Sequence, residues 1–294
     1  MKKTSFRSSL LLLLTAVIWG VAFVAQSAGM DYVGPFTFNA VRSLIGGAVL
    51  IPCVFLLNRG KPASAPHSRR DLLAGGVCCG FFLALASSFQ QFGIQYTSVG
   101  KAGFITALYI LLVPLFGLLF GKRVSGRVWL AVGIAVVGMY LLCVKEGFSI
   151  ALGDLLVMVC ALLFAVHILV IDHFSPRADG VKLSCIQFFT CGLLCSVGML
   201  VFEKPSFGQV LTAWMPILYA GVMSCGVAYT CQIIGQRDTD PTVASLILSL
   251  ESVVSVLAGW LLLHQPLSPR ELGGCALVFC AIILAQLPEK ASRI

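Results

Sequence analysis

The sequence predicts an all-α polytopic membrane protein with ten transmembrane helices, arranged as a five-plus-five inverted-topology repeat. Three observations lead to this fold class: an apolar composition, long apolar runs separated by short basic segments, and a likeness between the two halves of the chain. Of the 294 residues, 59% are hydrophobic and 11% are charged, whereas soluble domains carry roughly 25% charged residues. So few charges would not cover the surface of a water-soluble fold.

The apolar runs are long enough to cross a bilayer as helices. A crossing helix needs roughly 20 apolar residues, because the hydrocarbon layer is about 30 Å thick and a helix rises about 1.5 Å per residue. On this basis the sequence contains ten spans, at about 8–28, 36–57, 71–92, 99–120, 127–144, 153–171, 183–202, 211–232, 242–263 and 271–287.

The lysine and arginine residues predict the orientation of these spans. With the N-terminus in the cytoplasm, fifteen of them fall in cytoplasmic segments and four in external segments, while Arg42 lies within the second span. Positive charges concentrate on the cytoplasmic side of membrane proteins. We therefore expect a multi-pass protein of the cell (inner or plasma) membrane with both termini in the cytoplasm.

The two halves, residues 1–147 and 148–294, have the pattern of two copies of one five-helix unit. At an offset of 145 residues, 15–21 overlays 160–166, and Arg42 overlays Gln187. At an offset of 142 residues, identical side chains recur in the pairs Gln90 and Gln232, Gly93 and Gly235, Thr97 and Thr239, and Ala102 and Ala244.

An odd number of helices in each copy places the second copy in the membrane with the opposite orientation. Inverted repeats of this kind are typical of secondary transporters, whose two halves rock around a site near the midplane. Alternating access explains such a symmetry, whereas catalysis does not. The repeat therefore predicts a mechanism class without naming a solute.

Short motifs in several spans point to one family. They are 17–23 (VIWGVAF), 38–42 (FNAVR), 108–115 (LYILLVPL), 153–156 (GDLL) and 248–253 (LSLESV). Together and in this order, they resemble the EamA-type members of the drug/metabolite transporter superfamily over about residues 8–287. The resemblance implies ten helices, both termini in the cytoplasm, and export or exchange of metabolites. Many such proteins carry a Gly-Glu pair after the fourth and ninth spans, and this chain does not, so no role for that acidic residue is carried over.

Two ionisable residues lie within the predicted spans, where a charge is costly unless it pairs or faces water. Arg42 is a candidate for binding a carboxylate or phosphate of the solute, which its planar guanidinium suits. The alternatives are a structural ion pair or snorkelling to the outer surface. Glu251 lies near the midplane of the ninth span and is a candidate for binding the solute and for proton coupling. It could instead pair with Arg42 or bond to a neighbouring helix.

Four further side chains are candidates at similar depths. Trp19 and Tyr109 would form aromatic walls of a solute site, although core packing is the commoner role of such residues. Gln187, which overlays Arg42, is a further solute-binding candidate. His167 is a candidate for proton coupling, with a buried hydrogen bond to a carbonyl as the alternative. Pro114 removes a backbone bond from the fourth span and predicts a hinge there.

The sequence lacks the motifs of other function classes. It has no GxxxxGK[ST] loop for ATP, no Ser-His-Asp or HExxH arrangement, and no Cys and His spacing of a zinc site. The basic residues sit at helix ends, which disfavours a nucleic-acid partner. We therefore expect a protein that is not an enzyme, needs no cofactor or metal, and lies in a lipid bilayer.

These features predict a secondary active transporter that exports a small metabolite, with amino acids and related amphipathic solutes as examples. A proton or counter-solute gradient would drive it. The alternatives are an importer or exchanger of another polar metabolite, and an integral membrane protein that does not transport.

Overall fold

A computed structural model describes residues 5–58, 68–97, 99–119, 121, 124–143, 151–263 and 268–287. Within these ranges the chain is helical and contains no strand. The first half forms α1 (Phe6–Gly29), α2 (Pro35–Asn58), α3 (Arg69–Ile94), α4 (Val99–Ala107), α5 (Tyr109–Leu119) and α6 (Gly126–Cys143). The second half forms α7 (Leu152–Phe174), α8 (Gly180–Gly198), η1 (Met199–Glu203), α9 (Phe207–Thr212), α10 (Trp214–Leu218), η2 (Tyr219–Ala228), α11 (Tyr229–Gln236), α12 (Pro241–Leu248), α13 (Leu250–Leu263) and α14 (Pro269–Gln286).

Eight helical stretches among the described residues are long and apolar enough to cross a membrane. They are Phe6–Gly29, Pro35–Leu56, Arg69–Ile94, Val99–Leu119, Leu152–Phe174, Gly180–Glu203, Trp214–Gln236 and Pro241–Leu262. The prediction of a multi-pass helical membrane protein is therefore confirmed. The fifth and tenth predicted spans correspond to α6 and α14, where the apolar stretches Gly126–Gly138 and Leu272–Ala285 are shorter. A count of ten spans stays a prediction.

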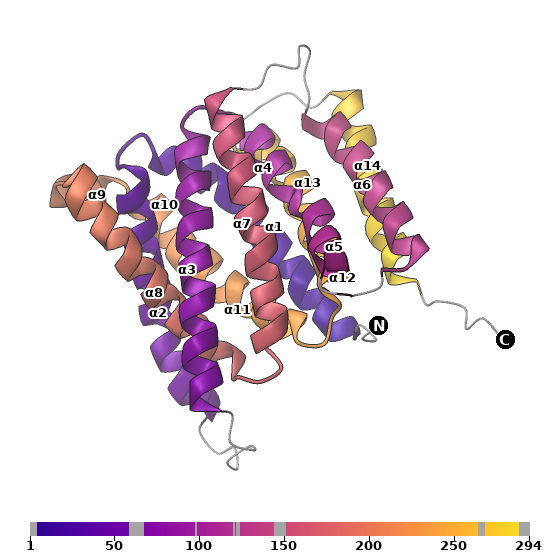
Figure 1. Ribbon diagram of the computed structural model, residues 1–294. Coiled ribbons are helices and arrows are strands. Elements are labelled where there is room, and N and C mark those ends of the chain that lie inside the picture. Colours follow the sequence, from indigo (N-terminus) through magenta and orange to yellow (C-terminus); the bar gives the residue numbers. More distant parts are fainter. Residues whose placement is uncertain are drawn as a thin grey trace.

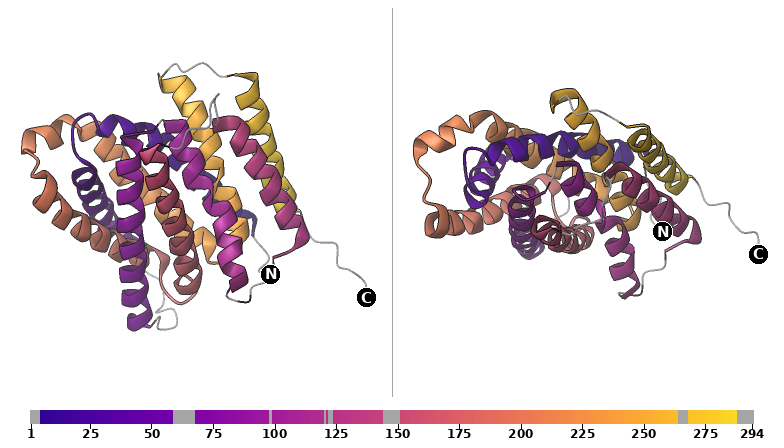
Figure 2. Two further views of the ribbon diagram at one scale, coloured as in Figure 1. Left: turned by 45° about the horizontal axis from the view of Figure 1, so that its top comes forward. Right: turned by 90° about the horizontal axis from the view of Figure 1, so that it is seen from above.

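The two halves of the chain interleave instead of folding side by side. The N-terminal helix α1 packs against η2, α11 and α13 of the second half, and α7 packs against α3 and α4 of the first. Across the bundle, α2 also packs against α8, and α6 runs beside α14 at one edge (Figure 1 and Figure 2). Helix α1 begins and α14 ends at the lower end of the bundle in Figure 1.

Glycines allow helices from the two halves to approach closely. A Cβ at Gly93 would lie 2.9 Å from the carbonyl oxygen of Gly153, and a Cβ at Gly235 would lie 3.1 Å from that of Ser8. These two contacts join α3 to α7 and α11 to α1. Small residues at such crossings let helix backbones pack tightly in membranes.

A second pair of close approaches lies nearer the middle of the bundle. A Cβ at Gly80 would lie 2.6 Å from the carbonyl oxygen of Gln187, and a Cβ at Gly221 would lie 3.1 Å from that of Arg42. The second contact involves η2, a π-helix in which each turn holds an additional residue. The glycines therefore fix how α3 meets α8 and how η2 meets α2.

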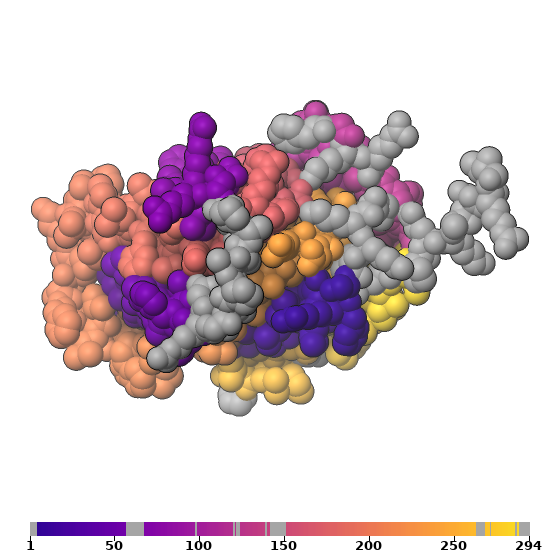
Figure 3. All heavy atoms as spheres, turned by 90° about the horizontal axis from the view of Figure 1, so that it is seen from below, coloured from indigo at the N-terminus to yellow at the C-terminus, as the bar shows by residue number. Residues whose placement is uncertain are grey.

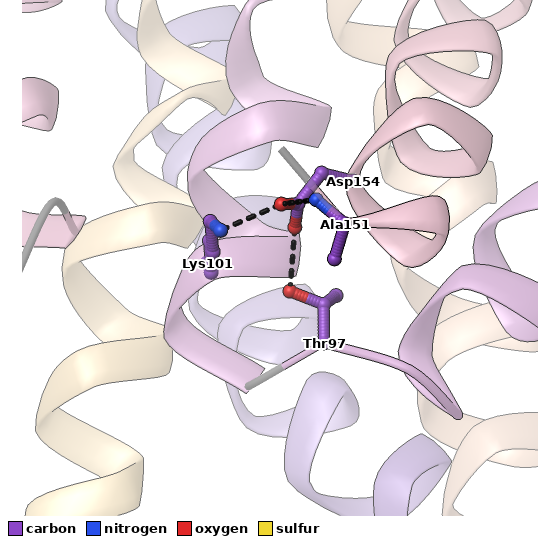
Figure 4. A network of polar contacts seen from close by, with 4 residues as sticks. All are labelled: Thr97, Lys101, Ala151 and Asp154. Carbon is purple, nitrogen blue, oxygen red and sulfur yellow. Dashed lines mark hydrogen bonds and ion pairs between the residues drawn. The ribbon is translucent and has the colours of Figure 1, made fainter. Parts of the chain in front are cut away.

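A polar network ties the connection between α3 and α4 to the start of α7 (Figure 4). Asp154 accepts hydrogen bonds from Thr97 Oγ1 at 2.8 Å and from the Ala151 backbone N–H at 2.9 Å. Its other contact is an ion pair of 2.6 Å with Lys101 Nζ. Asp154 therefore caps α7 and links it to α4 with charge-assisted bonds.

Replacing a glycine at a close crossing should weaken the fold. In a Gly80→Ala variant the new Cβ would lie 2.5 Å from Thr190 Cβ, so α3 and α8 must move apart. We expect a loss of about 1–3 kcal/mol, as for overpacked cores, and a lower melting temperature in detergent. The matched control is Gly133→Ala, which gains the same helix propensity and has no atom within 4 Å of its Cβ. Equal melting temperatures for the two variants would contradict this packing.

Candidate functional site

Side chains from both halves surround a cavity inside the bundle, here called the central cavity. Its empty volume is about 420 Å³. The first half contributes the lining residues Trp19, Phe23, Gln26, Arg42, Gln90, Thr106 and Tyr109. The second half contributes Phe164, Ile168, Ser224, Tyr229, Gln232 and Glu251. Four of the five predicted solute-binding residues line it: Trp19, Arg42, Tyr109 and Glu251.

Arg42 lies on α2 and brings a positive charge into the cavity wall. Its side chain is 5% exposed and forms no hydrogen bond or ion pair among the described residues. The guanidinium carbon lies 5.5 Å from the centre of the Phe38 ring, and Nε is buried without a partner. A buried charge normally has a partner, because an unpaired one loses its hydration without compensation. Arg42 is therefore arranged to receive an anion from outside the chain.

Glu251 provides the carboxylate of the cavity and lies near the start of α13. It is 3% exposed, and Tyr109 Oη donates a hydrogen bond of 2.8 Å to its Oε1. The bond links α5 of the first half to α13 of the second half. In the described part of the chain no ion pair joins Glu251 to Arg42. The two ionisable groups therefore line one cavity without neutralising each other directly.

Breaks in two helices place this tyrosine and this glutamate. The fourth predicted span divides at Leu108 into α4 and α5, and the ninth divides at Ser249 into α12 and α13. At the second break, Ser249 Oγ donates to the Leu246 carbonyl oxygen at 2.7 Å, a type of bond that often bends helices. Discontinuous helices of this kind commonly form the binding sites of transporters.

Pro114, the predicted hinge, lies inside α5. The break itself falls at Leu108, where the N–H of Leu111 bonds to the Leu108 carbonyl oxygen at 3.0 Å in a tighter turn. The proline cannot donate to the carbonyl of Ile110, so it weakens the first turn of α5 rather than ending α4. Its role as a hinge stays a prediction.

Aromatic rings form one wall of the cavity. The rings of Trp19 and Tyr229 are tilted by 56° with their centres 4.5 Å apart, and Phe23 and Phe164 also line the space. The indole Nε1 of Trp19 is buried without a hydrogen-bond partner in the described residues. This wall would hold an apolar group and still offer one N–H donor.

His167 and Gln187, two of the predicted site residues, are not among the lining residues. Both are fully buried, and His167 Nε2 lies 2.9 Å from Gln187 Oε1. The centre of the histidine ring lies 6.1 Å from that of Tyr229 and 6.3 Å from that of Phe164, which do line the cavity. The pair therefore packs behind the aromatic wall.

Sequence reasoning missed several lining residues. Tyr229 carries no mark of its depth or direction in the sequence. The glutamines seemed suited to bonds between helices, and Gln90 Nε2 does donate to Thr106 Oγ1 at 3.2 Å. However, Gln26 Oε1 and Gln232 Oε1 are buried without partners in the described residues. The overlay of Gln232 on the lining residue Gln90 is the one sequence signal that points to it.

Comparison with known proteins identifies the family. The EamA-like transporter family model matches residues 7–144 and again residues 151–287. An uncharacterized transporter of Archaeoglobus fulgidus is 33% identical over 94% of this chain and 84% of its own length. A chloroplast WAT1-related protein of Arabidopsis thaliana is 25% identical over 92% of this chain and 67% of its own.

The fold also has a counterpart among solved structures. One crystal structure superposes with a TM-score of 0.77 at 21% identity, covering 96% of this chain and 97% of its own. At that identity the likeness bears on the fold alone. The sequence matches and the apolar helices agree that this is a multi-pass membrane transporter. The chain belongs to the EamA-like transporter family.

Proposed function

We propose that this protein is a secondary active transporter that exports a small amphipathic metabolite bearing a carboxylate or phosphate, such as an amino acid. The observation that carries the proposal is the buried Arg42, which lines a cavity between the two halves and has no partner among the described residues. An anionic solute would complete its hydrogen bonds. The resemblance to metabolite exporters supports the outward direction.

Symmetry of the cavity lining supports the inverted repeat. Four pairs of lining residues are related by the two sequence offsets, 145 and 142 residues. They are Trp19 and Phe164, Phe23 and Ile168, Gln90 and Gln232, and Tyr109 and Glu251. The last pair is joined by a hydrogen bond, as expected for equivalent residues that meet at a two-fold axis. We infer that the cavity lies on the axis that relates the copies.

The helix crossings support the same relation. The contact of Gly93 with Gly153 and that of Gly235 with Ser8 join equivalent positions at the same offsets. The contact of Gly80 with Gln187 matches that of Gly221 with Arg42, except that this glycine pair is offset by 141 residues. One additional residue therefore enters the second copy after Gly221, within η2, and a π-helical turn is such an insertion.

Two copies in opposite orientation provide two equivalent conformations of one chain. Exchange of the two arrangements would open the central cavity first to one side of the membrane and then to the other. The double match to the family model supports two copies, one in residues 1–147 and the other in 148–294. Alternating access is therefore the mechanism that we propose.

Orientation in the cell membrane follows from the distribution of charge. Helix α1 begins and α14 ends at the same end of the bundle (Figure 1). The view of that end shows the start of α1, in indigo, beside orange segments of the second half (Figure 3), and α1 packs against α11 and α12. The excess of positive charge supports placing this end, and both termini, in the cytoplasm.

The remaining features bear on energy coupling and on the alternatives. Glu251 is the proposed proton site, because it is the carboxyl group that lines the cavity. For His167 the buried bond to Gln187 favours a structural role over proton coupling. An importer or exchanger would use the same cavity, so an assay of direction distinguishes them from an exporter.

Counterflow in proteoliposomes tests transport directly. Purified protein with pooled labelled metabolites should accumulate at least one anionic metabolite saturably, as measured by mass spectrometry. An Arg42→Gln variant should lose about tenfold or more of this transport, because charge-assisted hydrogen bonds contribute about 1.5–3 kcal/mol. The matched control is Arg69→Gln, an exposed arginine at the start of α3, which should transport normally.

Two results would count against the proposal. If folded protein accumulated no metabolite of any class, a role other than transport would replace it. If Arg42→Gln transported as well as the unchanged protein at equal expression, Arg42 would not bind the solute.

A double variant tests the structural role of the histidine. Gln187→Leu leaves His167 Nε2 buried without a partner, so we expect a lower melting temperature, corresponding to about 1 kcal/mol. Combining Gln187→Leu with His167→Leu should recover part of that loss. The pH dependence of transport should be the same in His167→Leu as in the unchanged protein. Loss of that pH dependence would instead assign His167 to proton coupling.

A further inference from the structure

The central cavity has one cationic side chain and one carboxyl group among its lining residues, Arg42 and Glu251. We infer that an anionic group of the solute at Arg42 and a proton at Glu251 bind cooperatively, so that solute and proton cross the membrane together. This inference rests on the proposed function and adds the rule by which the site balances charge.

The electrostatic argument begins with the empty cavity. Arg42 and an ionised Glu251 together carry no net charge, although no ion pair joins them in the described residues. A monoanion bound to Arg42 brings the sum to minus one. Because the site is buried, like charges repel strongly there, and the repulsion favours protonation of the carboxylate. Protonation of Glu251 restores neutrality.

The geometry of Glu251 leaves a position for this proton. Tyr109 donates its hydrogen bond to Oε1, while Oε2 accepts no hydrogen bond from the described residues. The proton can therefore occupy Oε2 while the bond to Tyr109 persists. The link between α5 and α13 is kept in both protonation states.

Other groups near Glu251 do not offer an equivalent proton site. The titratable side chains that interact with it are Tyr109 on α5, Tyr229 on α11 and Cys160 on α7. Phenols and thiols are ordinarily neutral at physiological pH. The cavity-lining side chains of α1 and α4, Trp19, Phe23, Gln26 and Thr106, do not titrate. Helices α6, α12 and α14 pack against α13 but contribute no lining residue.

The consequence for transport is a loaded cavity with no additional charge. One proton would cross with each monoanion in the same direction, and the membrane potential would then have little effect on the rate. A site that held only the anion would carry one negative charge across and respond to the potential.

Calorimetry with phenylacetate tests the inference, because this probe has one carboxylate and no other group that titrates in the range. Titrations of purified protein in buffers of different ionisation heat count the protons taken up on binding. We expect one proton per phenylacetate wherever Glu251 is ionised, and an affinity that falls about tenfold per pH unit in that range. Phenylacetamide, the uncharged analogue, should bind without proton uptake.

A charge-neutral variant identifies the proton site. In Glu251→Gln, phenylacetate binding should take up no proton, and its affinity should not vary with pH. The matched control is Asp31→Asn, an exposed carboxylate after α1, which should behave as the unchanged protein.

Three results would overturn the inference. They are phenylacetate binding without proton uptake from about pH 6 to about pH 9, proton uptake that persists in Glu251→Gln, and failure of phenylacetate to bind while counterflow detects transport of other solutes. The last result would leave the proposed transport intact. Absence of any counterflow would instead remove the proposed function.

Discussion

Hydrocarbon offers no partner to a charge, and this constraint explains where the chain places its polar side chains. Arg42 is buried in α2 without an ion pair or hydrogen bond among the described residues. It persists there because it borders a cavity, whereas Lys101 at the upper end is paired with Asp154. The glutamines and Glu251 gather around the same space. The bilayer therefore leaves the interior as the one place for polar chemistry, and the interleaved halves provide it.

The symmetry of the chain accounts for the shape of this site, and small departures from symmetry account for its chemistry. Tyr109 and Glu251 occupy equivalent positions, so one copy supplies a donor and the other an acceptor. Arg42 and Gln187 are also equivalent, yet Arg42 lines the cavity and Gln187 bonds to His167. The cavity therefore carries charge on one side of the proposed axis, which suits a solute that has distinct polar and apolar ends.

The sequence predicts the helices and the depth of side chains well, because span length and residue spacing follow from bilayer thickness. It found Trp19 and Glu251 because an aromatic or charged residue at midplane needs an explanation. It could not foresee that His167 and Gln187 face each other, since the rotation of each helix depends on tertiary packing. The breaks at Leu108 and Ser249 and the π-helix η2 were equally hidden, because they arise from local backbone geometry.

The central claim is that the cavity between the halves is the binding site for the transported solute. The most direct measurement is an experimental structure determined with a solute that the protein accumulates in counterflow. The account predicts that the anionic group of the solute lies within hydrogen-bond distance of Arg42, with its apolar part against Trp19 and Tyr229. A solute bound elsewhere, with the central cavity empty, would contradict it.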